Sequence, residues 1–140
     1  MKLFWSKAKL TELANLIMAE NIEVLETKFQ NGFNINAKFN ICEYLDETPI
    51  ILALCENKTK VIHWLLSKTV ELNKKGNPAF LMACSNCNIE TIKLLLLNGA
   101  NLNAKHEIGK TAMNDAQFGN NYDAISFLID NGYDKKEIAS

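Results

Sequence analysis

The sequence contains no arginine, and all fifteen of its basic residues are lysines. It also lacks any run of about eighteen apolar residues, the length at which a membrane-spanning helix is suspected. Arginine is the usual bidentate reader of guanine and phosphate, so its absence argues against nucleic-acid recognition. The formal net charge of −1 gives the chain no overall attraction to nucleic acid or acidic lipid. We therefore expect neither nucleic acid nor a membrane as its partner.

The first residues, "MKLFWSKAKL", lack the long apolar region and the small-residue cleavage site of a signal peptide. The sequence thus predicts a cytoplasmic protein whose four cysteines are reduced. With 140 residues, of which 48% are hydrophobic, the chain can bury the core of one domain spanning residues 1–140.

The sequence repeats itself. Four similar stretches occur along the chain, and each is followed by a residue that is expected to end a helix. The stretches are "TELANL" from Thr11, "TPIILA" from Thr48, "PAFLMA" from Pro78 and "TAMNDA" from Thr111, and the ending residues are Gly32, Thr69, Gly99 and Gly132. This pattern divides the chain into approximate repeats at residues 8–38, 44–73, 76–105 and 107–140.

Each repeat has the pattern of two helices. The first is expected to start at the threonine or proline, residues that suit a helix N-terminus. In the third repeat, Ile89, Ile92, Leu95 and Leu96 follow at helical spacing and predict a second helix that ends at Gly99. A unit this short cannot bury its apolar face alone, so the pattern favours an all-α solenoid of stacked helix pairs.

The stretches "TPIILA", "VIHWLL" and "NIETIKLLLLNGANLNAK" resemble ankyrin repeats, and the resemblance covers nearly the whole chain with the first and last repeats degenerate. The spacing from Ala83 to Ala116 matches the family's period of about 33 residues. The resemblance implies helix-turn-helix pairs joined by β-hairpin-like fingers. It also implies a non-enzymatic module whose fingers and inner helices form a concave surface for another protein.

Several residues depart from the ankyrin pattern. The signature histidine is replaced by Ala14, Ile51, Leu81 and Asn114, and the glycine between paired helices by Glu20, Asn57, Cys87 and Asn120. Asparagine tolerates the left-handed conformation, so two of the latter replacements are easy. The β-branched Thr69 stands where glycine should end a helix and predicts either a different helix end or backbone strain.

The expected fingers differ in length. The third, Asn103 to Thr111, has the standard length, the second, Asn73 to Pro78, is short, and the first, Asn36 to Thr48, is long and rich in apolar residues. We expect partner contact from finger and inner-helix residues. In the fingers these are Phe39, Ile41, Glu43, Tyr44, Leu45, Lys74, Lys75, Glu107, Ile108 and Lys110, and at the ends of the inner helices Cys55, Glu56, Ser85, Asn86 and Phe118.

Two alternatives concern this surface. The long first finger could instead fold back and cover its own repeats. A lysine-rich face, formed by Lys58, Lys60, Lys68, Lys74 and Lys75, is either simply solvated or a groove for an acidic partner. The chain is expected to be a monomer when free. Its role is either that of a general adaptor or that of a stand-alone inhibitor, immunity protein or antitoxin that blocks a toxin, effector or enzyme.

We predict no catalytic residues, no cofactor and no metal, although the cysteines offer a less favoured alternative. "CSNC", from Cys84 to Cys87, could be a redox pair or half of a zinc site, and Cys42 and Cys55 could complete it. A second C-x-x-C is missing, so buried free thiols are the simpler interpretation. His63 and His106 are expected to be solvated, Trp64 to lie in the core, and Phe4 and Trp5 to cover the end of the stack. Asn114 and Asp115 are expected at the water-facing surface of the last repeat.

Overall fold

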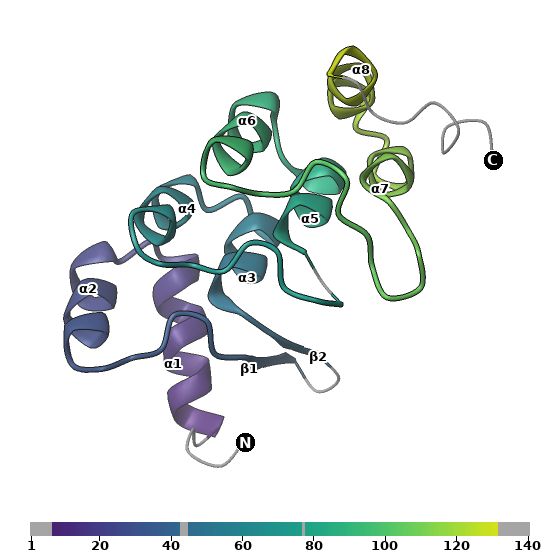
Figure 1. Cartoon of the computed structure of the whole chain (residues 1–140). Coiled ribbons are helices and arrows are strands. Elements are labelled where there is room, and N and C mark those ends of the chain that lie inside the picture. Colours follow the sequence, from purple (N-terminus) through teal and green to yellow (C-terminus); the bar gives the residue numbers. More distant parts are fainter. Residues whose placement is uncertain (1–6, 43–44, 77, 132–140) are drawn as a thin grey trace. The chain divides into compact units, whose positions relative to one another are not determined.

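The computed structural model describes residues 7–42, 45–76 and 78–131. Within these ranges the chain forms eight α-helices in four consecutive pairs and one two-stranded hairpin (Figure 1). The chain divides into two compact units, Met1–Val70 and Glu71–Ser140. The helix pairs confirm the repeat architecture predicted from the sequence. The expected Phe4 and Trp5 cover and the last helix-ending position, Gly132, lie outside the described residues.

Two helix pairs and the hairpin make up the first unit. Its elements are α1 (Lys7–Met18), α2 (Ile22–Gln30), β1 (Phe39–Cys42), β2 (Leu45–Glu47), α3 (Pro49–Cys55) and α4 (Thr59–Leu66). The inner helices α1 and α3 pack against each other, as do the outer helices α2 and α4 (Figure 1). Every residue of α3 from Pro49 to Leu54 is buried, because this short helix lies between α1 and α4. The continuous apolar run in "PIILAL" thus becomes a central core element.

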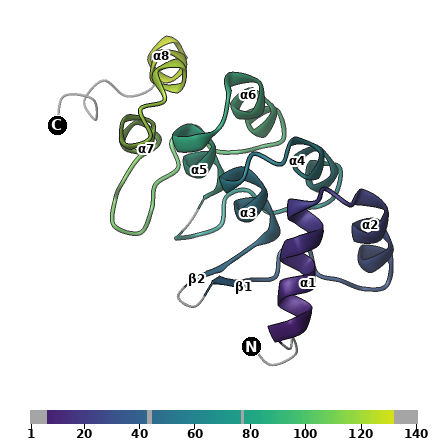
Figure 2. The same ribbon diagram turned by 180° about the vertical axis from the view of Figure 1, so that it is seen from behind.

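The second unit repeats this arrangement without a named strand among its described residues. Its elements are α5 (Ala79–Asn86), α6 (Ile89–Leu97), α7 (Ala112–Phe118) and α8 (Tyr122–Asp130). Inner helix α5 packs along α7, and outer helix α6 packs on α8 (Figure 2). Phe80, Leu95 and Met113 are fully buried at 0% exposure and form the centre of this core. Alanine and glycine let α5 and α7 approach closely: a Cβ atom on Gly119 would lie 2.1 Å from the carbonyl oxygen of Ser85.

Helix starts agree with the sequence in three repeats and differ in one. Thr111 is the N-cap of α7 and forms a capping box with Asn114, so Asn114 is polar because it caps the helix. Asn114 is also half-buried, so its expected exposure to water is only partial. The first helix begins at Lys7, one turn before the expected Thr11. Lysine, alanine and leucine in "KAKL" are all good helix formers, and they extend the helix through Thr11.

The turns between paired helices use left-handed residues in three repeats. Glu20, Asn57 and Asn120 have φ values of 53°, 53° and 52°, whereas Cys87 has a φ of −110° and ends α5 in extended backbone. Thr69 also stays outside the left-handed region, because α4 has already ended at Leu66. Of the two outcomes predicted for Thr69, the different helix end is the one found.

A polar cluster joins the outer helices α2 and α4. The indole Nε1 of Trp64 donates to Glu26 at 2.5 Å, and the Lys68 ammonium lies 2.8 Å from the same carboxylate and 4.9 Å from the centre of the Phe29 ring. Hydrogen bonds from Lys68 and Trp64 hold the pKa of Glu26 below its usual range. Trp64 is therefore half-buried with its polar edge engaged, not a pure core residue as expected.

No helix in the described part of the chain combines the length and the apolarity that a bilayer-spanning segment requires.

Candidate functional site

The first finger contains the hairpin, and Phe39, one of its predicted contact residues, points into the core of the first unit. Phe39 pairs with Glu47 and Asn40 with Asp46, while Ile41 occupies an irregularity before Cys42 pairs with Leu45. The Phe39 side chain is only 4% exposed, and its strand packs against α1. The expectation that Phe39 is available to a partner was wrong, because burying its ring in the core of its own unit removes it from water.

The remaining predictions for the first finger are not decided. Glu43 and Tyr44 lie outside the described residues, and the side chains of Ile41 and Leu45 are likewise not described. Their contact with a partner stays a prediction.

The ends of the inner helices present a mixed set of side chains. Cys55 and Glu56 are exposed at the end of α3. In the second unit, Asn86 is exposed at the end of α5, and Phe118 is 85% exposed at the end of α7. Ser85 is half-buried, and its hydroxyl donates to the carbonyl of Met82 within its own helix. Phe118 is thus the most accessible large apolar residue among the predicted inner-helix contacts.

The third finger is a closed turn with an apolar tip. His106 donates its backbone N–H to the carbonyl of Lys110 at 2.9 Å, and Gly109 donates to the carbonyl of His106 at 2.9 Å. A bridge between Lys105 and Thr111 closes its base. Ile108, at the tip, is 78% exposed. These backbone bonds fix the turn, and they present Ile108 together with the exposed Glu107 and Lys110.

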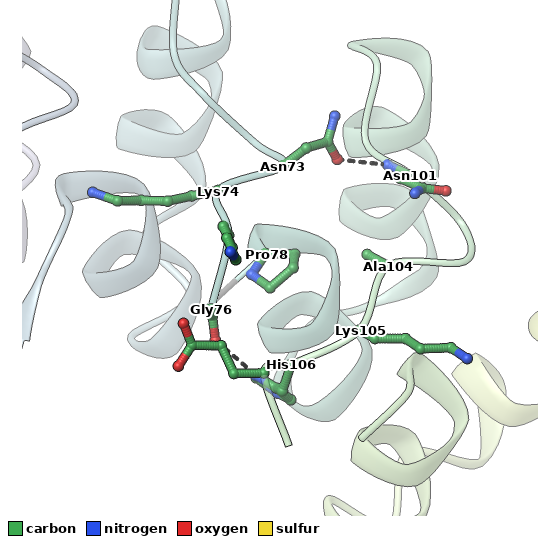
Figure 3. Close-up of a pocket in the computed structure, with 10 residues that line it drawn as sticks. Asn73, Lys74, Gly76, Pro78, Asn101, Ala104, Lys105 and His106 are labelled. Atoms are coloured by element: carbon green, nitrogen blue, oxygen red, sulfur yellow. Dashed lines mark hydrogen bonds between the residues drawn. The ribbon is translucent and has the colours of Figure 1, made fainter. Parts of the chain in front are cut away.

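A pocket of about 340 Å³ lies between the second and third fingers, wholly within the second unit (Figure 3). It brings together three of the predicted partner-binding residues: Lys74, Lys75 and Glu107. The sequence prediction did not include its other lining residues: Asn73, Gly76, Pro78, Asn101, Ala104, Lys105 and His106. The repeated "ELN" and "NLN" stretches show that the two loops are equivalent parts of successive repeats, but they do not indicate that Asn73 contacts Asn101.

His106 and Asp115 form a pair that the sequence prediction missed. The Nε2 atom of His106 lies 2.8 Å from a carboxylate oxygen of Asp115, and the two side chains are 24% and 17% exposed. The expectation of a solvated His106 and a water-facing Asp115 was therefore wrong. The finger folds back over the first turn of α7 and brings together residues nine positions apart. The only hint was that Asp115 occupies an inner-helix position where the second and third repeats have the apolar Leu52 and Met82. His63, by contrast, is exposed as expected.

The cysteines of the C-x-x-C stretch are buried and form no disulfide, as the simpler interpretation predicted. Cys84 and Cys87 are 0% and 4% exposed, whereas Cys55 is exposed. Burial raises the pKa of Cys84 to about 12, with a further contribution from the Asp115 carboxylate. The described residues contain no group of three or more histidine, cysteine or acidic side chains placed to hold a metal ion. The Cys42 side chain is outside that description, so the four-cysteine site stays a prediction.

The residues of the lysine-rich face do not share one solvated environment. Lys68 is engaged by Glu26 in the first unit, while Lys74 and Lys75 line the pocket in the second. The backbone N–H of Lys60 donates to the Glu20 carboxylate at 2.7 Å. These four lysines of the face therefore have different local surroundings.

Comparison with known proteins gives a consistent result. A family model described as ankyrin repeats in three copies matches residues 13–106 and 70–139. An ankyrin repeat protein of Acanthamoeba polyphaga mimivirus is 31% identical over 102 residues, which cover 71% of this chain and 13% of that protein. An ankyrin repeat protein of fowlpox virus is 30% identical over 113 residues, covering 77% of this chain and 33% of its own length.

A more distant relative is the α-latroinsectotoxin Lt1a of Latrodectus tredecimguttatus, which is 24% identical over 118 residues. The aligned residues cover 82% of this chain and 8% of the toxin. The chain thus spans a third or less of each of these relatives. Ankyrin repeats generally mediate protein–protein interaction. The structure contains helix pairs joined by fingers, and the family model matches within residues 13–139. The chain therefore belongs to the ankyrin repeat family.

Proposed function

We propose that this chain is a non-enzymatic protein-binding module that contacts a partner protein through its fingers and the ends of its inner helices. The observation that carries the proposal is Ile108, a large apolar side chain that is 78% exposed at the tip of a hydrogen-bonded turn. A fixed turn loses little conformational entropy when it docks, so an apolar residue on it is well placed to anchor a partner.

Other residues extend this surface. Phe118, 85% exposed, offers an aromatic side chain of the kind that often dominates binding energy. Glu107, Lys110 and Asn86 are exposed and supply polar groups of the kind found at an interface rim. Cys55, Glu56 and the tip of the first finger stay part of the proposal, whereas the buried Phe39 is removed from it.

The chain offers a matched pair of variants for testing the proposal. Leu97 is 84% exposed at the end of the outer helix α6 and belongs to none of the fingers, so Leu97→Glu controls for Ile108→Glu. Neither change should alter the melting temperature by more than about 2 °C, because surface substitutions of this kind usually change stability by less than about 0.5 kcal/mol. Both variants and the unchanged protein are used as bait in a lysate of the source organism.

We expect a partner that the unchanged protein and Leu97→Glu both retain and that Ile108→Glu loses. With the purified partner, calorimetry should show a loss of affinity of about ten-fold or more, or about 1.4 kcal/mol. A partner bound equally by all three would overturn the proposal for this finger. Whether binding also blocks a toxin, effector or enzyme, as an inhibitor or immunity protein would, stays a prediction from the sequence.

A further inference from the structure

The pocket between the second and third fingers has an apolar floor and polar walls. Pro78 and Ala104 are buried beneath it, and the loops 73–76 and 101–107 form its sides (Figure 3). Its volume is about 340 Å³. It can therefore accept a few side chains or a short stretch of backbone, but not a folded element.

Hydrogen bonds fasten the two loops to each other. The side chain of Asn73 accepts from the backbone N–H of Asn101 at 2.8 Å and donates to the carbonyl of Gly99 at 2.9 Å. Farther along, the Nδ1 atom of His106 lies 3.4 Å from the carbonyl oxygen of Gly76 (Figure 3). Because these contacts hold the two loops together, the pocket is preorganised and docking requires little further ordering of its walls.

The pocket is positive on a chain that is slightly negative overall. Lys74, Lys75 and Lys105 against Glu107 give the lining a formal charge of +2 when His106 is neutral, whereas the whole chain carries −1. Neither Lys74 nor Lys75 has an ion pair among the described residues. The charge of these two lysines is therefore available to an incoming acidic group.

The lysines do not converge on one point. The side chains of Lys74 and Lys105 extend toward opposite sides of the pocket (Figure 3). A single small anion at the centre could not contact both ammonium groups. An extended peptide could, because alternate side chains along a strand project about 7 Å apart and the backbone between them can lie on the apolar floor.

We propose that this pocket binds an extended acidic segment of the partner protein, with carboxylate side chains reaching the lysines at opposite rims. The inference rests on the proposed function and specifies the chemistry of the partner. Lysine ammonium groups act as compact point charges that tolerate separate carboxylates, and the sequence has no arginine for bidentate phosphate recognition. Glu107 on the rim further disfavours a continuous phosphate backbone.

Fluorescence anisotropy with defined probes tests this inference. The probe is a fluorescein-labelled synthetic peptide in which glutamate alternates with serine, and the control peptide has glutamine in place of each glutamate. The pocket variant is Lys74→Glu with Lys75→Glu. The charge-matched control is Lys60→Glu with Lys93→Glu, two exposed lysines on the outer helices that do not line the pocket.

We expect the glutamate peptide to bind, the glutamine peptide to bind at least about ten-fold more weakly, and the pocket variant to lose about ten-fold or more in affinity. The charge-matched control should change affinity less than about three-fold, and raised ionic strength should weaken binding. Equal binding of both peptides, or equal loss in both double variants, would overturn the inference. So would competition by inorganic phosphate, or tighter binding of an oligothymidylate of equal charge.

The Ile108→Glu experiment separates this inference from the proposed function. A partner that depends on Ile108 but is bound equally well by Lys74→Glu with Lys75→Glu would leave the protein-binding function standing and exclude the acidic pocket.

Discussion

At the residue scale, Glu20 has a strained backbone conformation, and its carboxylate binds the first turn of α4. Its φ of 53° lies in the left-handed region, which costs a residue with a Cβ atom roughly 1–2 kcal/mol. From that position its carboxylate accepts from the backbone N–H of Lys60 at 2.7 Å, in the first turn of α4. The N-cap residue of α4, Lys58, makes no side-chain cap of its own. Glu20 thus supplies from another helix pair the acceptor that α4 lacks.

Two substitutions of Glu20 distinguish the energetic cost of its backbone strain from the stabilisation by its hydrogen bond to α4. Glu20→Ala keeps the left-handed strain and loses the cap, so we expect a loss of about 1 kcal/mol in the free energy of unfolding. Glu20→Gly loses the same cap but relieves the strain, and should come within about 0.5 kcal/mol of the unchanged protein. Urea denaturation followed by circular dichroism measures both. Equal losses in the two variants would show that strain at this position has no energetic weight.

At the element scale, one asparagine joins three helices of the second unit. The amide nitrogen of Asn121 donates to the carbonyl oxygens of Cys84 at 2.9 Å and Cys87 at 2.8 Å, at the end of α5. Its side-chain oxygen accepts from the backbone N–H of Ala124 and caps α8. The turn between α7 and α8 is therefore fastened to α5 by a side chain, and the close approach at Gly119 completes this contact.

Asn121→Asp should remove the bonds to α5 while keeping the cap of α8. Aspartate is an equally good N-cap, but it cannot donate to the two carbonyls and places a negative charge beside them. We expect a loss of about 2 kcal/mol or more in the free energy of unfolding. Asn88→Asp is the control, since Asn88 caps α6 through Thr91 and is exposed. A similar effect of both substitutions in thermal denaturation would mean that the donated bonds contribute little.

At the scale of the whole molecule, the cysteines differ in accessibility. Cys55 is exposed, while Cys84 and Cys87 lie in the core of the second unit. Desolvation raises the pKa of both Cys55 and Cys84, but only for Cys84 does it reach about 12. The thiolate is the reactive form, so at neutral pH Cys84 is both covered and protonated.

Thiol labelling therefore reports on folding. At pH 8 we expect iodoacetamide to label Cys55 within minutes, while Cys84 and Cys87 are labelled only as the second unit opens. Peptide mass spectrometry assigns the sites, and in a Cys42→Ser background the further change Cys55→Ser should remove the fast reaction. In urea all these thiols should react at similar rates. Rapid labelling of Cys84 in the native protein would contradict the burial on which its high pKa depends.

The sequence by itself determined the helix pairs, their order and the family, because helical periodicity and helix-ending residues are local signals. It also indicated that Thr69 would require either a different helix end or backbone strain, and the structure shows the former. Only the tertiary structure decided that Phe39 turns inward, that His106 meets Asp115, and that Lys74, Lys75 and Lys105 border one pocket. Contacts between successive fingers depend on how loops of unequal length pack across repeats, and no periodicity within one repeat encodes that packing.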